Sequence, residues 1–248
     1  MKISSGSKAA VAFALLLACV IGCKSGKNSA TTSETNESTS SSSGTTSTTK
    51  TTPPDIAGEY SVVGANPNGS AYKGELEVIK HGDVYQFRWS SGTSYDGVGV
   101  QLGDVVAVAF TTGENGKGCG VVDYTIIDDG ASLDGIWGYW GTDQSGTEKA
   151  KRTIGAGLIG AYEATGTNPD GKQYKAQIAI APAGSGYRFV WSNNTEGFGI
   201  RRGDNVAVGI GGTRCGFVSY EVKSDGTLDG VWGGYGSEKT GTEKATKQ

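Results

Sequence analysis

Acidic residues recur in pairs along the chain, and paired carboxyl groups are what glycoside hydrolases use for acid, base and nucleophilic roles. The pairs are Asp104 and Asp204, Asp134 and Asp229, and Glu148 and Glu243. That chemistry requires two carboxyl groups about 5–10 Å apart in one cleft. Asp104 follows a glycine, as is usual in turns, and Asp134 directly follows a predicted turn. Glu148 lies in a strand-like Gly-Thr-Glu-Lys-Ala segment, where we expect it to point outward and pair with lysine. A polysaccharide hydrolase is therefore the least favoured function.

The chain of 248 residues contains one histidine, His81, so the sequence offers few residues for catalysis by histidine or for a metal site with histidine ligands. A Ser-His-Asp triad would depend on His81, and no G-x-S-x-G elbow accompanies it. Asp123, Asp128 and Asp129 could ligate calcium, but their spacing matches no known calcium loop. The sequence thus offers no catalytic set, no metal site and no cofactor, which favours a protein that is not an enzyme.

The charge balance argues against one class of partner. The chain carries 22 Lys and Arg residues against 25 Asp and Glu residues, a formal net charge of −3. Binding to nucleic acid relies on a surplus of basic side chains that contact phosphates. We therefore expect no nucleic-acid partner.

Cys119 and Cys215 occupy equivalent places in the two halves of the chain and are candidates for a disulfide. Export from the cytoplasm, which the N-terminal segment indicates, would permit the bond. Bridging requires the two halves to face each other across a pseudo-two-fold axis, with Cα atoms within about 7 Å. One buried free thiol in each half is the alternative, and the sequence leaves both open.

An internal duplication determines the architecture. Tyr85–Ser90 returns as Tyr187–Ser192, and Leu133–Gly138 returns as Leu228–Gly233. Such self-similarity indicates a repeated structural unit. We assign residues 55–152 to β repeat 1 and residues 158–248 to β repeat 2, as two closely packed units. The spacing also allows one merged structure.

Each copy has the pattern of about eight short strands. Apolar and polar residues alternate over 72–78 and 85–90, and again over 174–180 and 187–191. Period-two alternation is typical of half-buried strands in antiparallel sheets, and no segment shows a helical period. The 42 glycines lie largely at the ends of these runs, as in tight hairpins. We predict an all-β fold of two tandem, antiparallel, up-and-down barrel-like units, closed to hide their edges.

Glycine-rich hairpins, tryptophans near strand ends and about eight strands in a small unit resemble the avidin family. No residue of that family's ligand site is carried over, because no motif matches residue by residue. The repeat is also similar to units of uncharacterised secreted bacterial proteins, some of them labelled fibronectin-binding.

Aromatic residues divide into two groups. Six rings fall on the predicted inward faces: Tyr72, Tyr85, Phe87, Trp89, Tyr124 and Trp137. They would nearly fill a small barrel, so we expect a packed core, and a ligand cavity would need a gap near a barrel mouth. The second group differs between the copies and is the candidate binding surface for a glycan or protein: Trp140, Tyr139, Tyr95 and Tyr235. A plug at the barrel end is the alternative role for these four.

The N-terminus predicts export and lipidation. Residues 9–22 are apolar and uncharged, too short to span a bilayer comfortably but typical of a secretion signal. The run ends in Val20-Ile21-Gly22-Cys23, which resembles the lipobox of bacterial lipoproteins. That resemblance implies a signal peptide over residues 1–22 and a lipid on Cys23. Cys19 is the alternative site.

Residues 23–54 contain the lipidated cysteine and a tract rich in serine and threonine, which cannot bury enough apolar surface to fold. We predict a disordered tether that holds the β units off a membrane. The chain is then a lipid-anchored protein of the bacterial cell envelope, periplasmic or surface-exposed, acting as a non-catalytic binding or adhesion module. A structural or accessory envelope lipoprotein without a small ligand is the alternative.

Overall fold

The computed structural model describes residues 54–113 and 116–248. The signal peptide, Cys19, Cys23 and all of the tether except Pro54 lie outside the described residues. Within those ranges the chain is all-β, and its one helical element is a 3-10 turn, η1 (Gly212–Arg214). No helix among these residues has the length and apolarity to cross a membrane.

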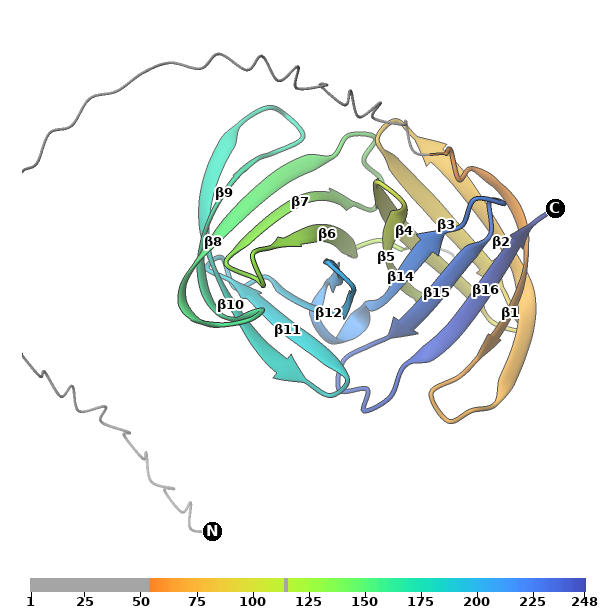
Figure 1. Ribbon diagram of the computed structural model, residues 1–248. Helices are drawn as coiled ribbons and strands as arrows, with labels where there is room; N and C mark the ends of the chain where they lie inside the picture. The colour runs from red at the N-terminus through yellow and green to blue at the C-terminus, as the bar shows by residue number, and fades with distance from the viewer. Residues whose placement is uncertain (1–53, 114–115) are drawn as a thin grey trace, which may run out of the picture. The chain divides into compact units, whose positions relative to one another are not determined.

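The strands close into two antiparallel barrels of eight strands each, which confirms the predicted fold class (Figure 1). The first barrel contains β1 (Gly58–Ala65), β2 (Ala71–His81), β3 (Val84–Ser90), β4 (Ser94–Leu102), β5 (Val105–Thr112), β14 (Gly216–Val222), β15 (Leu228–Gly233) and β16 (Gly241–Lys247). The second contains β6 (Gly120–Ile127), β7 (Ser132–Tyr139), β8 (Gly146–Ala156), β9 (Ile159–Thr167), β10 (Gln173–Ala183), β11 (Gly186–Trp191), β12 (Glu196–Arg202) and β13 (Asn205–Ile210). Neighbouring strands follow one another as an up-and-down meander, except at three places, where β1 pairs with β16, β5 with β14 and β13 with β6.

The exceptions are where the two sequence copies exchange strands. β5 pairs with β14 rather than β6, and β13 pairs with β6 rather than β14. The first barrel therefore joins the first five strands of copy one to the last three of copy two, and the second barrel takes the remainder. Figure 1 shows this as orange and yellow strands beside blue ones. The boundaries 55–152 and 158–248 mark sequence repeats, and neither repeat closes a barrel by itself.

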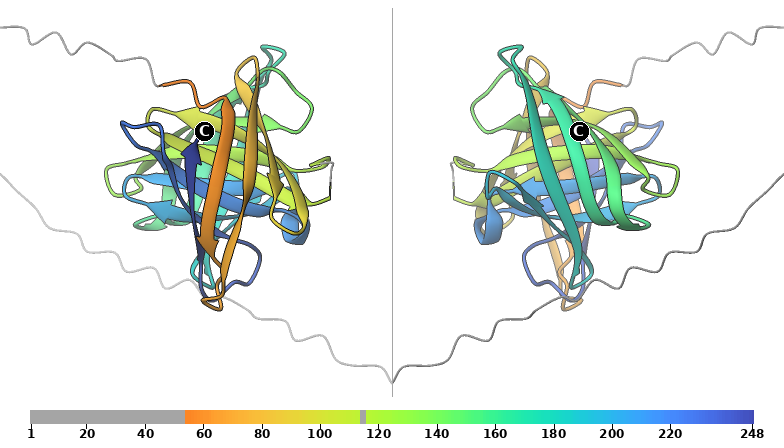
Figure 2. Two further views of the ribbon diagram at one scale, coloured as in Figure 1. Left: turned by 90° about the vertical axis from the view of Figure 1, so that its right-hand side faces the viewer. Right: turned by 90° about the vertical axis from the view of Figure 1, so that its left-hand side faces the viewer.

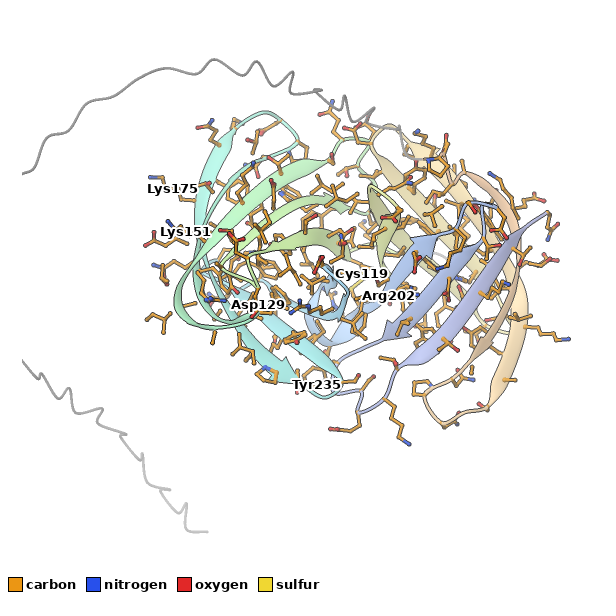
Figure 3. All side chains as sticks on the ribbon, in the orientation of Figure 1. Cys119, Asp129, Lys151, Lys175, Arg202 and Tyr235 are labelled. Carbon is orange, nitrogen blue, oxygen red and sulfur yellow. A yellow bond between two sulfur atoms is a disulfide. The ribbon has the colours of Figure 1, made fainter. Side chains whose placement is uncertain are left out.

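A disulfide between Cys119 and Cys215 joins the two crossings. Cys119 directly precedes β6, where the chain enters the second barrel, and Cys215 directly precedes β14, where it returns. Their Cα atoms are 5.9 Å apart. Of the two alternatives for these cysteines, the structure has the disulfide, and Figure 3 shows Cys119 between the two barrels.

Glycine inside the barrels makes room for the rings. A Cβ atom on Gly64 would stand 2.3 Å from the Tyr72 ring, and one on Gly241 would stand 2.2 Å from Trp232. In the second barrel Gly166 and Gly146 hold Tyr174 and Trp137 in the same way. Much of the glycine content thus serves aromatic packing across neighbouring strands, which adds to the turn role expected from the sequence.

One end of each barrel is closed by a short plug. Ile56 is 2% exposed in the first barrel, and the Tyr60 hydroxyl donates to its carbonyl oxygen at 2.7 Å. Leu158 and Tyr162 repeat this arrangement in the second barrel, at 3.0 Å. Figure 2 shows the first barrel facing the viewer on the left and the second on the right.

The barrels meet through a separate cluster of small apolar side chains. Its buried members are Val84, Val98, Val100, Ala107, Ala109, Cys119, Val121, Ala207 and Cys215.

Two buried polar side chains, Asp123 on β6 and Ser219 on β14, occupy equivalent positions in the two sequence copies. Both are fully buried, and their side-chain oxygens have no hydrogen-bond partner among the described residues. Asp123 alternates with Val122 and Tyr124 of the second core, so it points out of that barrel toward the interface.

Removal of the disulfide should destabilise the described fold. We expect Cys119→Ser/Cys215→Ser to lose about 2–5 kcal/mol of unfolding free energy, because the bond closes a loop with a sequence separation of 96. Urea denaturation measures the loss, and the unmutated protein in reductant should match the variant. Alkylation of both thiols in the folded, unreduced protein would show that the bond does not form.

Asp123 should give the fold a pH-dependent stability. Burial raises the pKa of Asp123 to about 8, partly opposed by the Asn205 side chain. The folded state therefore holds a proton that the unfolded state releases near pH 4, so this stabilisation is present in acid and declines as the pH rises toward 8. The decline is at most roughly 1.4 kcal/mol per pH unit.

Urea unfolding of Asp123→Ser, which installs the side chain of the equivalent position, should show a shallower decline than the unmutated protein between pH 4 and pH 8. Asp104→Ser, at an exposed turn, is the control and should retain the full dependence. Parallel profiles for the unmutated protein and Asp123→Ser would rule Asp123 out as the cause.

Candidate functional site

The open end of each barrel contains a buried glutamate from the last strand of a sequence copy. Glu243 on β16 is 7% exposed in the first barrel, and Glu148 on β8 is 3% exposed in the second. The expectation that Glu148 points outward is wrong. Gly146, Glu148 and Ala150 alternate with the exposed Thr147 and Lys149, so the glutamate shares the inward face with two small residues.

Three neutral donors hold each carboxylate. In the first barrel Tyr72 donates to Glu243 Oε2 at 2.8 Å, and Trp89 Nε1 donates to Oε1 at 2.9 Å. The Tyr220 hydroxyl also donates to Oε1. Because Oε1 receives two donors and Oε2 receives one, Oε2 retains capacity for a further donor.

The second barrel repeats the cluster with equivalent residues. Tyr174 donates to Glu148 Oε2 at 2.9 Å, and Trp191 Nε1 donates to Oε1 at 3.1 Å. The Tyr124 hydroxyl is the third donor. In each barrel the glutamate and one tyrosine come from one sequence copy, and the other tyrosine and the tryptophan come from the other copy. The strand exchange therefore assembles both clusters.

The tyrosines remain protonated donors. Burial, followed by the charge of the neighbouring glutamate, raises the pKa of Tyr124 and of Tyr220 well above the usual value. The same two causes raise the pKa of Tyr72 and of Tyr174. Each cluster thus surrounds a buried glutamate with donors that carry no charge of their own.

A cavity opens above each cluster. The first barrel's cavity has a volume of about 230 Å³ and is lined by Asn66, Tyr72, Trp89, Ser91, Tyr95, Phe110, Val218, Trp232 and Glu243. The second barrel's cavity is about 350 Å³, and its walls include Trp137, Tyr139, Tyr174, Trp191, Ile210 and Glu148. The rings do not fill the barrels completely, and the gap lies at the mouth.

The four aromatics predicted as a binding surface lie in three kinds of place. Tyr95 lines the first cavity, where it meets Phe110 edge-on with ring centroids 5.8 Å apart. Tyr139 is 36% exposed and lines the second cavity. Trp140 packs against the cluster between the barrels, and Tyr235 is 59% exposed at a loop, away from Cys119 in Figure 3. They do not form one platform, and a role in binding stays a prediction.

The remaining acids lie outside the barrels. Asp134 pairs with Lys149 at 3.0 Å on the second barrel, and Asp229 of the first barrel pairs with Arg202 of the second at 3.2 Å. Asp104 and Asp204 are exposed at turns, which confirms that expectation. Each cavity is lined by one carboxylate, so the paired geometry of a glycoside hydrolase is not assembled there.

Other reactive groups do not converge on the cavities. His81 is exposed at the end of β2, with Nε2 3.3 Å from the Gln86 side chain. Asp123 faces the other barrel, whereas Asp128 and Asp129 lie in the turn after β6. The described residues contain no group of three or more His, Cys, Asp or Glu side chains that could hold a metal ion.

Sequence reasoning missed the glutamate clusters, although a signal for them is present. In Gly146–Ala150 and in its repeat Gly241–Ala245, the glutamate lies two residues after a glycine and two residues before an alanine, so a strand places it on one face with these two small residues. On that pattern the glutamate belongs to the inward face. Comparisons with family models, curated proteins and solved structures gave no match, so the geometry carries the functional argument.

Loss of a donor to the buried carboxylate should be costly. We expect Tyr220→Phe to lower the unfolding free energy by about 1.5–3 kcal/mol, the range for a hydrogen bond to a charged group. Tyr95→Phe is the matched control, because the Tyr95 hydroxyl makes no hydrogen bond within the described residues, and it should change stability by less than about 0.5 kcal/mol. Denaturant unfolding compares them, and equal losses would contradict the ionised cluster.

Proposed function

We propose that this protein is a lipid-anchored, non-catalytic binding module of the bacterial cell envelope, with one small-ligand pocket in the open end of each barrel. The observation that carries the proposal is the recurrence of one arrangement in both barrels. Each mouth has an aromatic wall, a buried carboxylate and space above it. Ligand sites in proteins commonly combine an apolar concave wall with a few fixed polar groups.

The cavity volumes favour this role over a purely structural one. Small barrels normally fill their interiors with side chains. Ligand pockets usually have volumes of about 300–1,000 Å³. The second cavity, at about 350 Å³, is at the lower end of this range, and the first, at about 230 Å³, lies just below it and suits a smaller ligand. An accessory envelope lipoprotein without a ligand would have no need for a charged group beneath such a space, since burying an ion without an ionic partner costs stability.

The N-terminal sequence supports the anchoring part of the proposal. The lipobox-like segment ending at Cys23, with Cys19 as the alternative, would attach a lipid, and the membrane would be the first partner. The Ser/Thr-rich tract would then act as a tether. A glycan or a protein segment entering a mouth is the expected second partner.

A thermal-shift screen of the purified protein tests the proposal, using neutral sugars, amino acids, amines and matrix proteins. A ligand that binds only the folded state increases the unfolding free energy by mass action, by about 2.7 kcal/mol at 100 times its dissociation constant, and this raises the unfolding midpoint. Val218→Phe and Val122→Phe should fill the first and second cavities, respectively, because these valines line them. We expect at least one compound to raise the unfolding midpoint of the unmutated protein, and we expect this rise to disappear in Val218→Phe, in Val122→Phe or in both.

Each variant must first retain the ligand-free unfolding midpoint. No shift across the panel would favour the structural alternative. A shift that survives Val218→Phe and Val122→Phe together would place the ligand outside the barrels.

A further inference from the structure

We propose that the first barrel's pocket binds an organic cation, an amine or a methylated ammonium group, held between aromatic faces and the Glu243 carboxylate. This inference rests on the proposed function and names the ligand class for one of its two sites.

The charge of the pocket lacks a counterion. Glu243 receives three hydrogen bonds, all from neutral groups. No Lys, Arg or His is found among the described residues that line the cavity. The aromatic walls of the cavity leave less solvent to screen a negative charge there than in bulk water, so the charge attracts a positive ligand.

Aromatic faces supply the second attraction. The five rings that line the cavity are Tyr72, Trp89, Tyr95, Phe110 and Trp232. Phe110 contacts two of the other rings: its ring centroid is 5.8 Å from that of Trp89 and 6.3 Å from that of Trp232. Clusters of this kind bind quaternary ammonium groups through the negative face of each ring.

The outer surface beside the mouth is acidic. A hollow lined by the exposed Glu59, Glu75 and Glu77 shares Trp89 and Tyr95 with the cavity, and Arg88 in the same hollow pairs with Glu77 at 3.4 Å. Three exposed glutamates against one arginine produce a negative potential next to the entrance. Such a potential raises the local concentration of cations and speeds their association.

The second barrel provides an internal comparison. Its cavity has Ile210 where the first has Phe110, and the exposed Lys175 is among its lining residues. It is also larger, about 350 Å³ against about 230 Å³. Five rings line each cavity, and Lys73 stands beside Tyr72 on β2 as Lys175 stands beside Tyr174 on β10. The replacement of Phe110 by Ile210 and the larger volume are therefore the differences that make the second pocket the weaker cation site.

Isothermal titration calorimetry with choline and its neutral isostere 3,3-dimethylbutan-1-ol separates charge from shape. We expect choline to bind the purified protein at least about tenfold more tightly than the isostere. Phe110→Ile, which installs the residue of the second barrel, should weaken choline binding severalfold. Ile210→Phe in the second barrel is the matched control and should not weaken it.

Glu243→Gln removes the charge and should abolish the preference for choline, provided that circular dichroism and the unfolding midpoint show a folded protein. If that variant fails to fold, the choline comparison and Phe110→Ile still decide the question. Equal affinities for choline and the isostere would overturn the cation inference while supporting a pocket in the proposed function. No choline binding at about 10 mM by the folded protein would overturn the inference too, and the wider ligand screen would then judge the proposed function separately.

Discussion

The pairing of β5 with β14 and of β13 with β6 is the constraint on which the rest of the structure depends. A sheet of eight strands must close to leave no edge exposed, and here closure requires strands from both sequence copies. The exchange brings Tyr220 and Glu243 to Tyr72 and Trp89, so no single copy contains a complete cluster. The disulfide lies where the chain crosses between barrels, and it therefore holds the connections that determine which strands meet.

The sequence predicts the strands well and their partners poorly, for a physical reason. Period-two alternation over Tyr72–Val78 and Tyr85–Ser90 reports which side chains face inward, and the structure places those residues on β2 and β3. Pairing depends on complementarity between whole strands. Because β6 and β14 derive from equivalent segments, either one offers β5 a similar edge and similar inward residues. A duplicated sequence cannot distinguish closure within a copy from exchange between copies.

The inward glutamates were missed because charge outweighed periodicity in the interpretation of Gly146–Ala150. A charged side chain is rarely buried without a partner, which made an outward ion pair with Lys149 the natural expectation. The partners, however, lie on other strands: Tyr124 on β6, Tyr174 on β10 and Trp191 on β11. These contacts arise only once the barrel closes. The pattern in the segment itself could have indicated the face, but not the donors that make burial tolerable.

In each barrel the plug closes the end opposite the pocket, so the pocket opens away from the plugged end. In the first barrel the chain enters at the closed end, where Ile56 is buried, and β1 then runs to Asn66 at the open mouth. The entry is held by Asp55, whose carboxylate accepts a hydrogen bond from Tyr85 at 3.2 Å and pairs with Lys80 at 3.4 Å. A tether attached at this end would leave the opposite end of the barrel unobstructed. Attachment at the closed end is therefore compatible with the proposed role of the open mouth in binding, and the same plug at Leu158 leaves the second mouth open as well.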